Sequence, residues 1–290
     1  MKKLLLCVGA AKTGTTWLYQ NLRHHPSLHF TPEKELNFFF TQYGAFNRLS
    51  ERARFGKLAE FFDRARTNFV KDVPDDLFRR RLGPFHRNLG WYKKFANGQV
   101  GDEWYRRLFQ RMEEGQFACD FSPSTSLISD EGWAHVAGFA DEVKVIYVLR
   151  RPDERLWSHA KFHAAFIGKF AEFSKMSTAE MHAMAERCNL LADGDYGTIL
   201  GRLSAHIPAE NRLCIDYARI GAEPESVLND VAGFLGVANI APPEGKPGGK
   251  VNVSEKLPKP AAFGAPYRQR FEKETRLLVE QGVGFAKAWL

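Results

Sequence analysis

The sequence is poor in cysteine. Its four cysteines, Cys7, Cys119, Cys188 and Cys214, lie far apart and form no C-x-x-C pair. This spacing indicates neither a zinc site nor a disulfide framework. Reduced and buried thiols are typical of proteins in a reducing compartment, so we expect a cytoplasmic protein. Since no cluster of metal-ligating residues stands out either, we expect no metal.

Long hydrophobic runs are also missing. No apolar stretch reaches the roughly 18 to 20 residues that a transmembrane helix needs, so we expect no membrane span. The N-terminal sequence MKKLLLCVGAA begins like a secretion signal, but its short apolar run continues directly into a glycine-rich turn. We therefore interpret this run as the first buried strand.

Hydrophobic and basic residues are plentiful. Hydrophobic residues make up 44% of the 290 positions, and 24 of them are phenylalanine, which is enough for a substantial core. The formal net charge is +7, which fits an anionic ligand but is also found in ordinary soluble proteins. No nucleic-acid-binding module is recognisable, so we do not expect a nucleic acid partner.

Strand patterns alternate with helix patterns along most of the chain. Continuous, β-branched apolar runs predict buried strands at 3–9, 142–150 and 212–217. Helices are predicted at 15–25, 51–67, 153–166, 176–190, 224–235 and 265–281. This alternation predicts the α/β class with a parallel sheet. We expect one domain over residues 1–290.

A glycine turn follows the first predicted strand. Gly9 and Gly14 keep the spacing of a nucleotide triphosphatase loop, but Thr15 occupies the position of its lysine and Lys12 lies before the second glycine. The amides of such a turn and of the next helix can bind an anion. The alternative is a turn that only joins strand to helix.

The motif KTGTTW resembles the 5′-phosphosulfate loop of sulfotransferases that use 3′-phosphoadenosine 5′-phosphosulfate (PAPS). The resemblance implies that the lysine contacts the phosphosulfate and its bridging oxygen. The positions that match this loop are Lys12, Thr13, Gly14, Thr15 and Thr16. Trp17 matches a tryptophan that packs on the adenine in some members. The resemblance also implies a three-layer, P-loop-like parallel sheet flanked by helices.

The segment VIYVLRRPDERLWSHAKFH, residues 145–163, resembles the 3′-phosphate element of the same family. This match implies that Arg150 and Ser158 bind the 3′-phosphate, and guanidinium groups do pair bidentately with phosphate. The alternative is that Arg150 and Arg151 are only surface charges at the end of a strand.

The segment TPEKELNFFF, residues 31–40, resembles the K-E-x-x-F-F motif of heparan N- and 3-O-sulfotransferases. The resemblance implies that Glu35 is the catalytic base, with Lys34 beside it. We expect Phe38 and Phe39 to form a wall that desolvates this carboxylate, which suits a general base. The alternative is a solvated turn.

Histidine is the base in the small-molecule branch of the family. The candidates here are His25, His86, His159 and His163. His159 and His163 lie one helical turn apart just after Ser158, and His163 is the histidine that we keep as a second catalytic candidate.

Residues 41–100 interleave basic and aromatic side chains without a strand pattern, and we expect a helical insertion that forms a lid. Its arginines and aromatic rings suit an anionic or sugar acceptor. The segment DFSPS, residues 120–124, resembles the family's E-x-S-P-x-Y element, with Asp120 at its acidic position. Near the C-terminus, Lys246 and Lys250 lie where the family has a basic loop that closes on the nucleotide.

Together these motifs predict a sulfotransferase that moves a sulfuryl group from PAPS to a hydroxyl or amine and releases adenosine 3′,5′-bisphosphate (PAP). The K-E-x-x-F-F motif favours a saccharide acceptor, and the oligomeric state is open. One alternative is a P-loop kinase, which would place a lysine at Thr15 and a magnesium-binding aspartate at the end of the second long strand. The other is a catalytically silent relative that binds the nucleotide.

Overall fold

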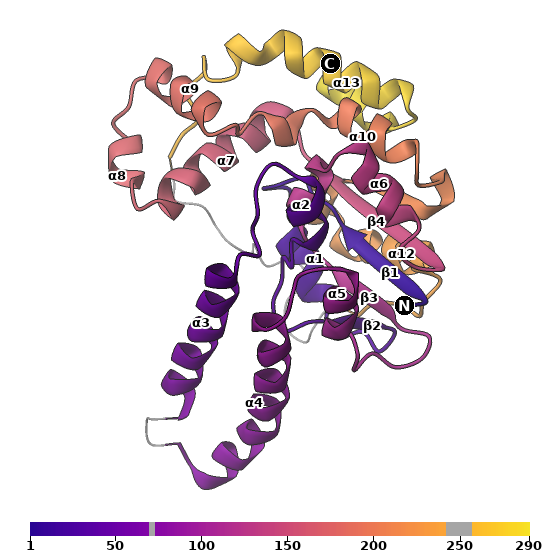
Figure 1. The fold of residues 1–290 in the computed structure, drawn as a ribbon. Helices are drawn as coiled ribbons and strands as arrows, with labels where there is room; N and C mark the ends of the chain where they lie inside the picture. Colours follow the sequence, from indigo (N-terminus) through magenta and orange to yellow (C-terminus); the bar gives the residue numbers. More distant parts are fainter. Residues whose placement is uncertain (70–72, 242–256) are drawn as a thin grey trace.

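The structure is a computed structural model that describes residues 1–69, 73–241 and 257–290. Five parallel strands form one sheet in the order β2-β3-β1-β4-β5 (Figure 1). The strands are β1 (Lys3–Cys7), β2 (Leu28–Phe30), β3 (Phe117–Asp120), β4 (Glu142–Leu149) and β5 (Arg212–Asp216). The three predicted strands are confirmed as β1, β4 and β5, whereas β2 and β3 were not predicted.

Helices cover both faces of this sheet, because successive strand residues point to opposite sides. Leu5 of β1 and Val148 of β4 face a core that includes residues of α1 (Thr15–Leu22), α11 (Tyr217–Ala222) and α12 (Pro224–Leu235). Leu4 and Val145 face the other core, which contains residues of α2 (Phe38–Tyr43), α5 (Asp102–Leu108), α6 (Asp130–Ala137), α10 (Tyr196–Ser204) and α13 (Arg268–Glu280). The predicted three-layer α/β fold is therefore confirmed.

A third group of helices follows β4 in the chain. It consists of α7 (Pro152–Phe166), α8 (Phe170–Phe173) and α9 (Thr178–Arg187), which enclose a separate apolar cluster. Pro152 begins α7 at a position where its missing N–H costs nothing. A capping box between Ser177 and Glu180 begins α9. The long helix α7 therefore starts directly beyond the carboxyl end of β4.

Helices α3 (Glu51–Phe69) and α4 (Asp75–Ala96) form a hairpin that extends away from the sheet (Figure 1). Phe61 of α3 stacks on Tyr92 of α4, with ring centroids 4.5 Å apart. At the base of the hairpin, the buried Arg54 guanidinium donates hydrogen bonds to the carbonyls of Phe95 and Ala96. The predicted helix at 51–67 is confirmed, whereas a lid formed by residues 41–100 stays a prediction.

No helix within the described ranges is both long enough and apolar enough to cross a membrane.

Candidate active site

The turn between β1 and α1 is held in one conformation. Gly14 has a φ of 90°, and a Cβ added there would lie 3.1 Å from side-chain atoms of Tyr217 and Ile220, so glycine is required. The Ala10 N–H donates to the Val148 carbonyl at 2.8 Å, and the Thr13 hydroxyl donates to the Ala10 carbonyl at 2.7 Å. The loop is therefore fixed to β4 and closed on itself, as an anion-binding loop needs to be.

A buried polar cluster from α7 and from the short 3-10 helix Ala192–Gly194 supports this loop. The Ala11 N–H donates to Asp193, and the fully buried Arg155 donates to His159 Nδ1 at 3.0 Å. Because a guanidinium can only donate, His159 Nδ1 is the unprotonated nitrogen. Burial, followed by the charges of Arg155 and Lys12, lowers the pKa of His159 to about 3. His159 is therefore neutral and engaged beneath the loop.

Cationic side chains surround Lys12. Burial lowers the pKa of Lys12, the charges of Arg150, Lys34 and Lys161 act in the same direction, and the charge of Glu35 opposes them. Its ammonium nitrogen lies 3.9 Å from the centroid of the Phe162 ring, which stands on α7. Crowded positive charge of this kind is relieved by an anion bound among the cations.

Arg150 follows β4 and lies on the same side as the loop. Its guanidinium lies 4.6 Å from the Tyr217 ring centroid and 3.4 Å from the Glu154 carboxylate. Ser158 lies on α7 one helical turn before Phe162, whose ring contacts Lys12. The structure thus brings the two segments that resemble the phosphosulfate and 3′-phosphate elements to one edge of the sheet.

Lys34 reaches the beginning of α1. Its ammonium nitrogen lies 3.0 Å from the Thr16 hydroxyl, 3.4 Å from the Thr15 hydroxyl and 3.4 Å from a Glu35 carboxylate oxygen. We predicted Lys34 only as a neighbour of the base. The structure places it as a second lysine beside the turn between β1 and α1, and its place in the K-E motif was the only sequence signal for this position.

Glu35 lies beside the loop in an open setting. Its side chain is 45% exposed and faces Lys34, while Phe38 and Phe39 are buried in the core. The expectation that these phenylalanines desolvate the carboxylate is therefore wrong. Glu35 and Asn37 adopt left-handed conformations, with φ of 64° and 55°, in the turn that leads from the exposed carboxylate to the buried rings.

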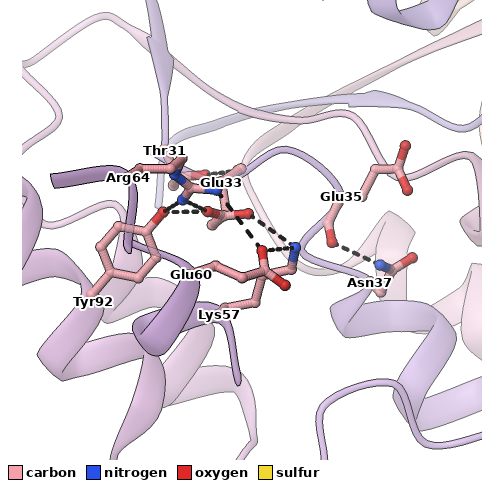
Figure 2. Close-up of polar contacts among 8 residues, drawn as sticks. All are labelled: Thr31, Glu33, Glu35, Asn37, Lys57, Glu60, Arg64 and Tyr92. Carbon is pink, nitrogen blue, oxygen red and sulfur yellow. Dashed lines mark hydrogen bonds and ion pairs between the residues drawn. The ribbon is translucent and has the colours of Figure 1, made fainter. Parts of the chain in front are cut away.

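Glu33 points away from Glu35 and binds the helical hairpin (Figure 2). Its carboxylate accepts hydrogen bonds from the Tyr92 hydroxyl and from the Arg64 guanidinium and lies 3.7 Å from the Lys57 ammonium. Only 12% of the Glu33 side chain is exposed. Glu33 is therefore occupied in joining the hairpin to the Glu35 loop, which leaves Glu35 as the carboxylate available to a substrate.

The other histidine candidates differ in position. His163 is partly buried on α7, one turn after His159. His25 lies beyond the C-terminal end of α1, where its Nδ1 accepts from the Ser27 N–H at 3.2 Å, and His86 is exposed on α4. Of these, His163 is the one that lies on α7, the helix whose Phe162 contacts Lys12 of the turn after β1.

The remaining nucleotide-binding candidates are Trp17, Lys246 and Lys250. Trp17 is only 6% exposed and packs in the core with Leu5 and Ile146, so little of its ring is open to an adenine. Lys246 and Lys250 lie outside the described residues. Within the described ranges, no group of three or more histidine, cysteine or acidic side chains could hold a metal ion.

The fold and the site define an α/β protein in which lysine and arginine side chains surround a glycine turn after the first strand. The family model described as "Sulfotransferase domain" matches residues 2–244, and the chain therefore belongs to the sulfotransferase domain family. It is accordingly a transferase of sulfuryl groups. This confirms the class predicted from the loop motif and excludes a kinase as its family.

Curated relatives are distant. The chain is 25% identical to the human bifunctional heparan sulfate N-deacetylase/N-sulfotransferase 3 over 245 residues, which is 80% of this chain and 22% of that protein. It is 28% identical to the Xenopus tropicalis bifunctional heparan sulfate N-deacetylase/N-sulfotransferase 1 over 159 residues, which is 50% of this chain and 18% of that protein. The chain thus matches about a fifth of the length of these relatives.

Solved structures share the fold. A sulfotransferase from Alicyclobacillus acidocaldarius superimposes with a TM-score of 0.60 at 19% identity, covering 96% of this chain and 94% of that one. A sulfotransferase domain from the curacin biosynthetic pathway gives a TM-score of 0.52 at 15% identity, covering 93% and 98%. At these identities the likeness concerns the fold alone.

Proposed function

We propose that this chain transfers the sulfuryl group of PAPS to a hydroxyl or amine of an acceptor and releases PAP. The observation that carries the proposal is the convergence of Lys12, Lys34 and Arg150 around a rigid loop at the carboxyl edge of the sheet. In this proposal Lys12 and the loop amides hold the phosphosulfate, with Thr13, Gly14, Thr15 and Thr16 forming the loop and helix start. Arg150 and Ser158 hold the 3′-phosphate.

The proposed chemistry needs a base on one side of the sulfur and positive charge on the other. Glu35 accepts the proton of the acceptor hydroxyl or amine while that oxygen or nitrogen forms a bond to sulfur. The bond from sulfur to the bridging oxygen breaks, and its electron pair remains on the phosphate. Lys12 stabilises the charge that develops on this leaving oxygen. Lys34 lies between Glu35 and the loop, so it can bind the sulfuryl oxygens during transfer.

A saccharide is the acceptor class that we favour. The names of the distant relatives refer to heparan sulfate N-sulfotransferases, and the α3–α4 hairpin joins the Glu35 loop through Glu33. Exposed rings on α3, Phe55 and Phe62, provide faces that can stack on sugar rings. In this proposal the hairpin is the surface along which the acceptor approaches the base.

Calorimetry with PAP and with magnesium-ATP tests the donor. Binding of PAP is expected at micromolar concentrations or below, and ATP should bind much more weakly because it lacks the 3′-phosphate. Turnover is then measured as release of PAP from PAPS with an amine-bearing glucosamine oligosaccharide, a neutral oligosaccharide and a simple phenol as acceptors. Binding of ATP without binding of PAP would contradict the proposal.

The Glu35→Gln variant tests the base. We expect kcat to fall by about 100-fold with PAP affinity unchanged, since a general base typically contributes about this much or more. Glu210→Gln is the matched control, because Glu210 is exposed and precedes β5 at the opposite edge of the sheet. If Glu35→Gln leaves turnover unchanged while His163→Gln abolishes it, the base is His163.

A further inference from the structure

A buried carboxylate lies directly beneath the Glu35 loop. Asp120 is the last residue of β3 and is only 2% exposed. It accepts hydrogen bonds from the Tyr105 hydroxyl at 3.0 Å, from the Ser122 hydroxyl at 2.5 Å and from the Leu36 N–H. Such donors favour the ionised carboxylate and partly offset the effect of burial, and each donor is in turn fixed in place.

The backbone amides of the two residues that follow Glu35 are bound to this cluster. The Leu36 N–H binds Asp120 directly, and the Asn37 N–H donates to the Ser122 hydroxyl oxygen at 2.9 Å. The Ser122 hydroxyl in turn donates to Asp120. The same loop contains two residues in the left-handed conformation, Glu35 and Asn37. This conformation costs on the order of 1 kcal/mol for each residue and persists only where the surrounding structure enforces it.

We propose that Asp120 is a positioning residue that holds the Glu35 carboxylate in its catalytic orientation, and that protonation of Asp120 releases the loop and lowers turnover in mild acid. The proposal rests on Glu35 being the base of the proposed reaction. Asp120 does not face the acceptor itself. It acts through the backbone amides of Leu36 and Asn37, because protonation places a hydrogen on a carboxylate whose oxygens now face three hydrogen-bond donors.

Among the buried groups in this cluster, Asp120 is the one whose protonation changes near neutral pH. Burial raises the pKa of Asp120 to about 6, and the charge of Glu35 acts in the same direction, while the bonds from Ser122, Tyr105 and Leu36 oppose it. Its titratable neighbours are Tyr105 of α5, Cys7 of β1 and Cys119 of β3. Burial raises the pKa of each of these three groups, so they stay protonated near pH 7.

The Asp120→Asn variant tests the proposal, since asparagine keeps the shape and removes the charge. We expect kcat to fall about tenfold at pH 8, PAP affinity to stay within about twofold of wild type, and the acid limb of the kcat profile near pH 6 to disappear. In hydrogen exchange, the Leu36 and Asn37 amides should exchange at least tenfold faster. A parallel loss of PAP affinity, or unchanged exchange at both amides, would overturn the proposal.

A double-mutant cycle with Glu35→Gln separates positioning from general destabilisation. If Asp120 acts through Glu35, adding Asp120→Asn to Glu35→Gln lowers kcat no further. A full tenfold additional loss contradicts the proposal. If Glu35→Gln by itself leaves kcat unchanged, the proposed base is wrong, whereas a large effect of Glu35→Gln with none of Asp120→Asn refutes only the positioning role.

Two milder variants decide the question if Asp120→Asn fails to fold. Tyr105→Phe removes a donor that stabilises the ionised carboxylate but touches no loop amide, so it should move the acid limb to higher pH with kcat at pH 8 unchanged. Ser122→Ala removes the link to Asn37, so it should lower kcat at every pH. Identical pH profiles for wild type and Tyr105→Phe would contradict the proposal.

Discussion

Protonation of His159 and protonation of Asp120 change the stability of the fold in opposite directions. The pKa of His159 is about 3 in the folded protein and about 6.5 in an unfolded chain, so the unfolded state binds more protons between these values. His159 therefore reduces stability progressively as the pH falls from 6.5 towards 3. The pKa of Asp120 is about 6 in the folded protein and about 3.9 when unfolded. Its contribution has the opposite sign and is lost as the pH rises through 6.

This opposition gives a prediction for stability in acid. In wild type the two contributions partly cancel between about pH 4 and pH 6. Asp120→Asn should make the free energy of unfolding fall more steeply with acid, by up to about 1.4 kcal/mol per pH unit, and His159→Asn should make it fall less. Urea denaturation of the three proteins at several pH values between 4.5 and 7 measures these slopes. Equal slopes for all three would show that neither group is linked to folding.

Arg150 offers a prediction about which phosphate it binds. Arg150→Ala should weaken PAP binding by about tenfold or more, because a charge-assisted pair with the 3′-phosphate is lost, while the affinity for adenosine 5′-monophosphate changes little. Calorimetry with both nucleotides measures the difference. Arg151→Ala is the matched control, since the neighbouring Arg151 side chain is 60% exposed and pairs with Asp153. Equal losses for the two nucleotides would place Arg150 elsewhere on the ligand.

Sequence reasoning found the residues that lie within continuous motifs and missed those that meet only in the fold. Lys12, Arg150 and Glu35 stand in recognisable segments, and the structure places all three at one edge of the sheet. The support that Asp193 gives the loop joins residues about 180 positions apart, since it accepts from the Ala11 N–H. The local sequence around Asp193 carries no mark of this contact, so it could not have been predicted.

At the scale of elements, prediction succeeded where one local pattern was long. The eight-residue β4 is apolar almost throughout and was recognised, because a strand buried on both faces has this pattern. The three residues of β2 and the four of β3 are too short to show a period, and their identity comes from pairing with each other and with β1. The helices were located within about three residues at their ends, as fraying helix termini allow.

The turn into α1 depends on the positive φ of Gly14. Gly14→Ala should lower the free energy of unfolding by about 1 to 2 kcal/mol and abolish PAP binding, because alanine is strained at a φ of 90° and its Cβ would press on Tyr217 and Ile220. Gly56→Ala is the control, since a Cβ on Gly56 in α3 meets no atom within 4 Å. That control should raise stability slightly. Retained PAP affinity in Gly14→Ala would show that the loop does not hold the nucleotide.

Across the whole molecule the positive charge is unevenly placed. Residues 51–96 contain 12 lysines and arginines and 6 acidic residues, so this segment alone accounts for +6 of the formal charge of +7. Its described helices, α3 and α4, stand away from the sheet, and Glu33 joins them to the Glu35 loop (Figures 1 and 2). If the acceptor is anionic, as proposed, we expect this charged hairpin to attract it towards Glu35.

The role of the hairpin charge can be tested on exposed arginines of α4. Reversing two exposed charges of α4 in the Arg79→Glu/Arg80→Glu variant should raise KM for an anionic oligosaccharide about tenfold at low salt, and the difference from wild type should shrink as sodium chloride screens the charges. PAP affinity and KM for a neutral acceptor should stay unchanged. Arg268→Glu/Arg276→Glu is the matched control, because it changes the net charge equally on exposed positions of α13, which lies at the opposite end of the molecule (Figure 1). An equal rise of KM in both double variants would show that the acceptor responds to the net charge and not to the hairpin.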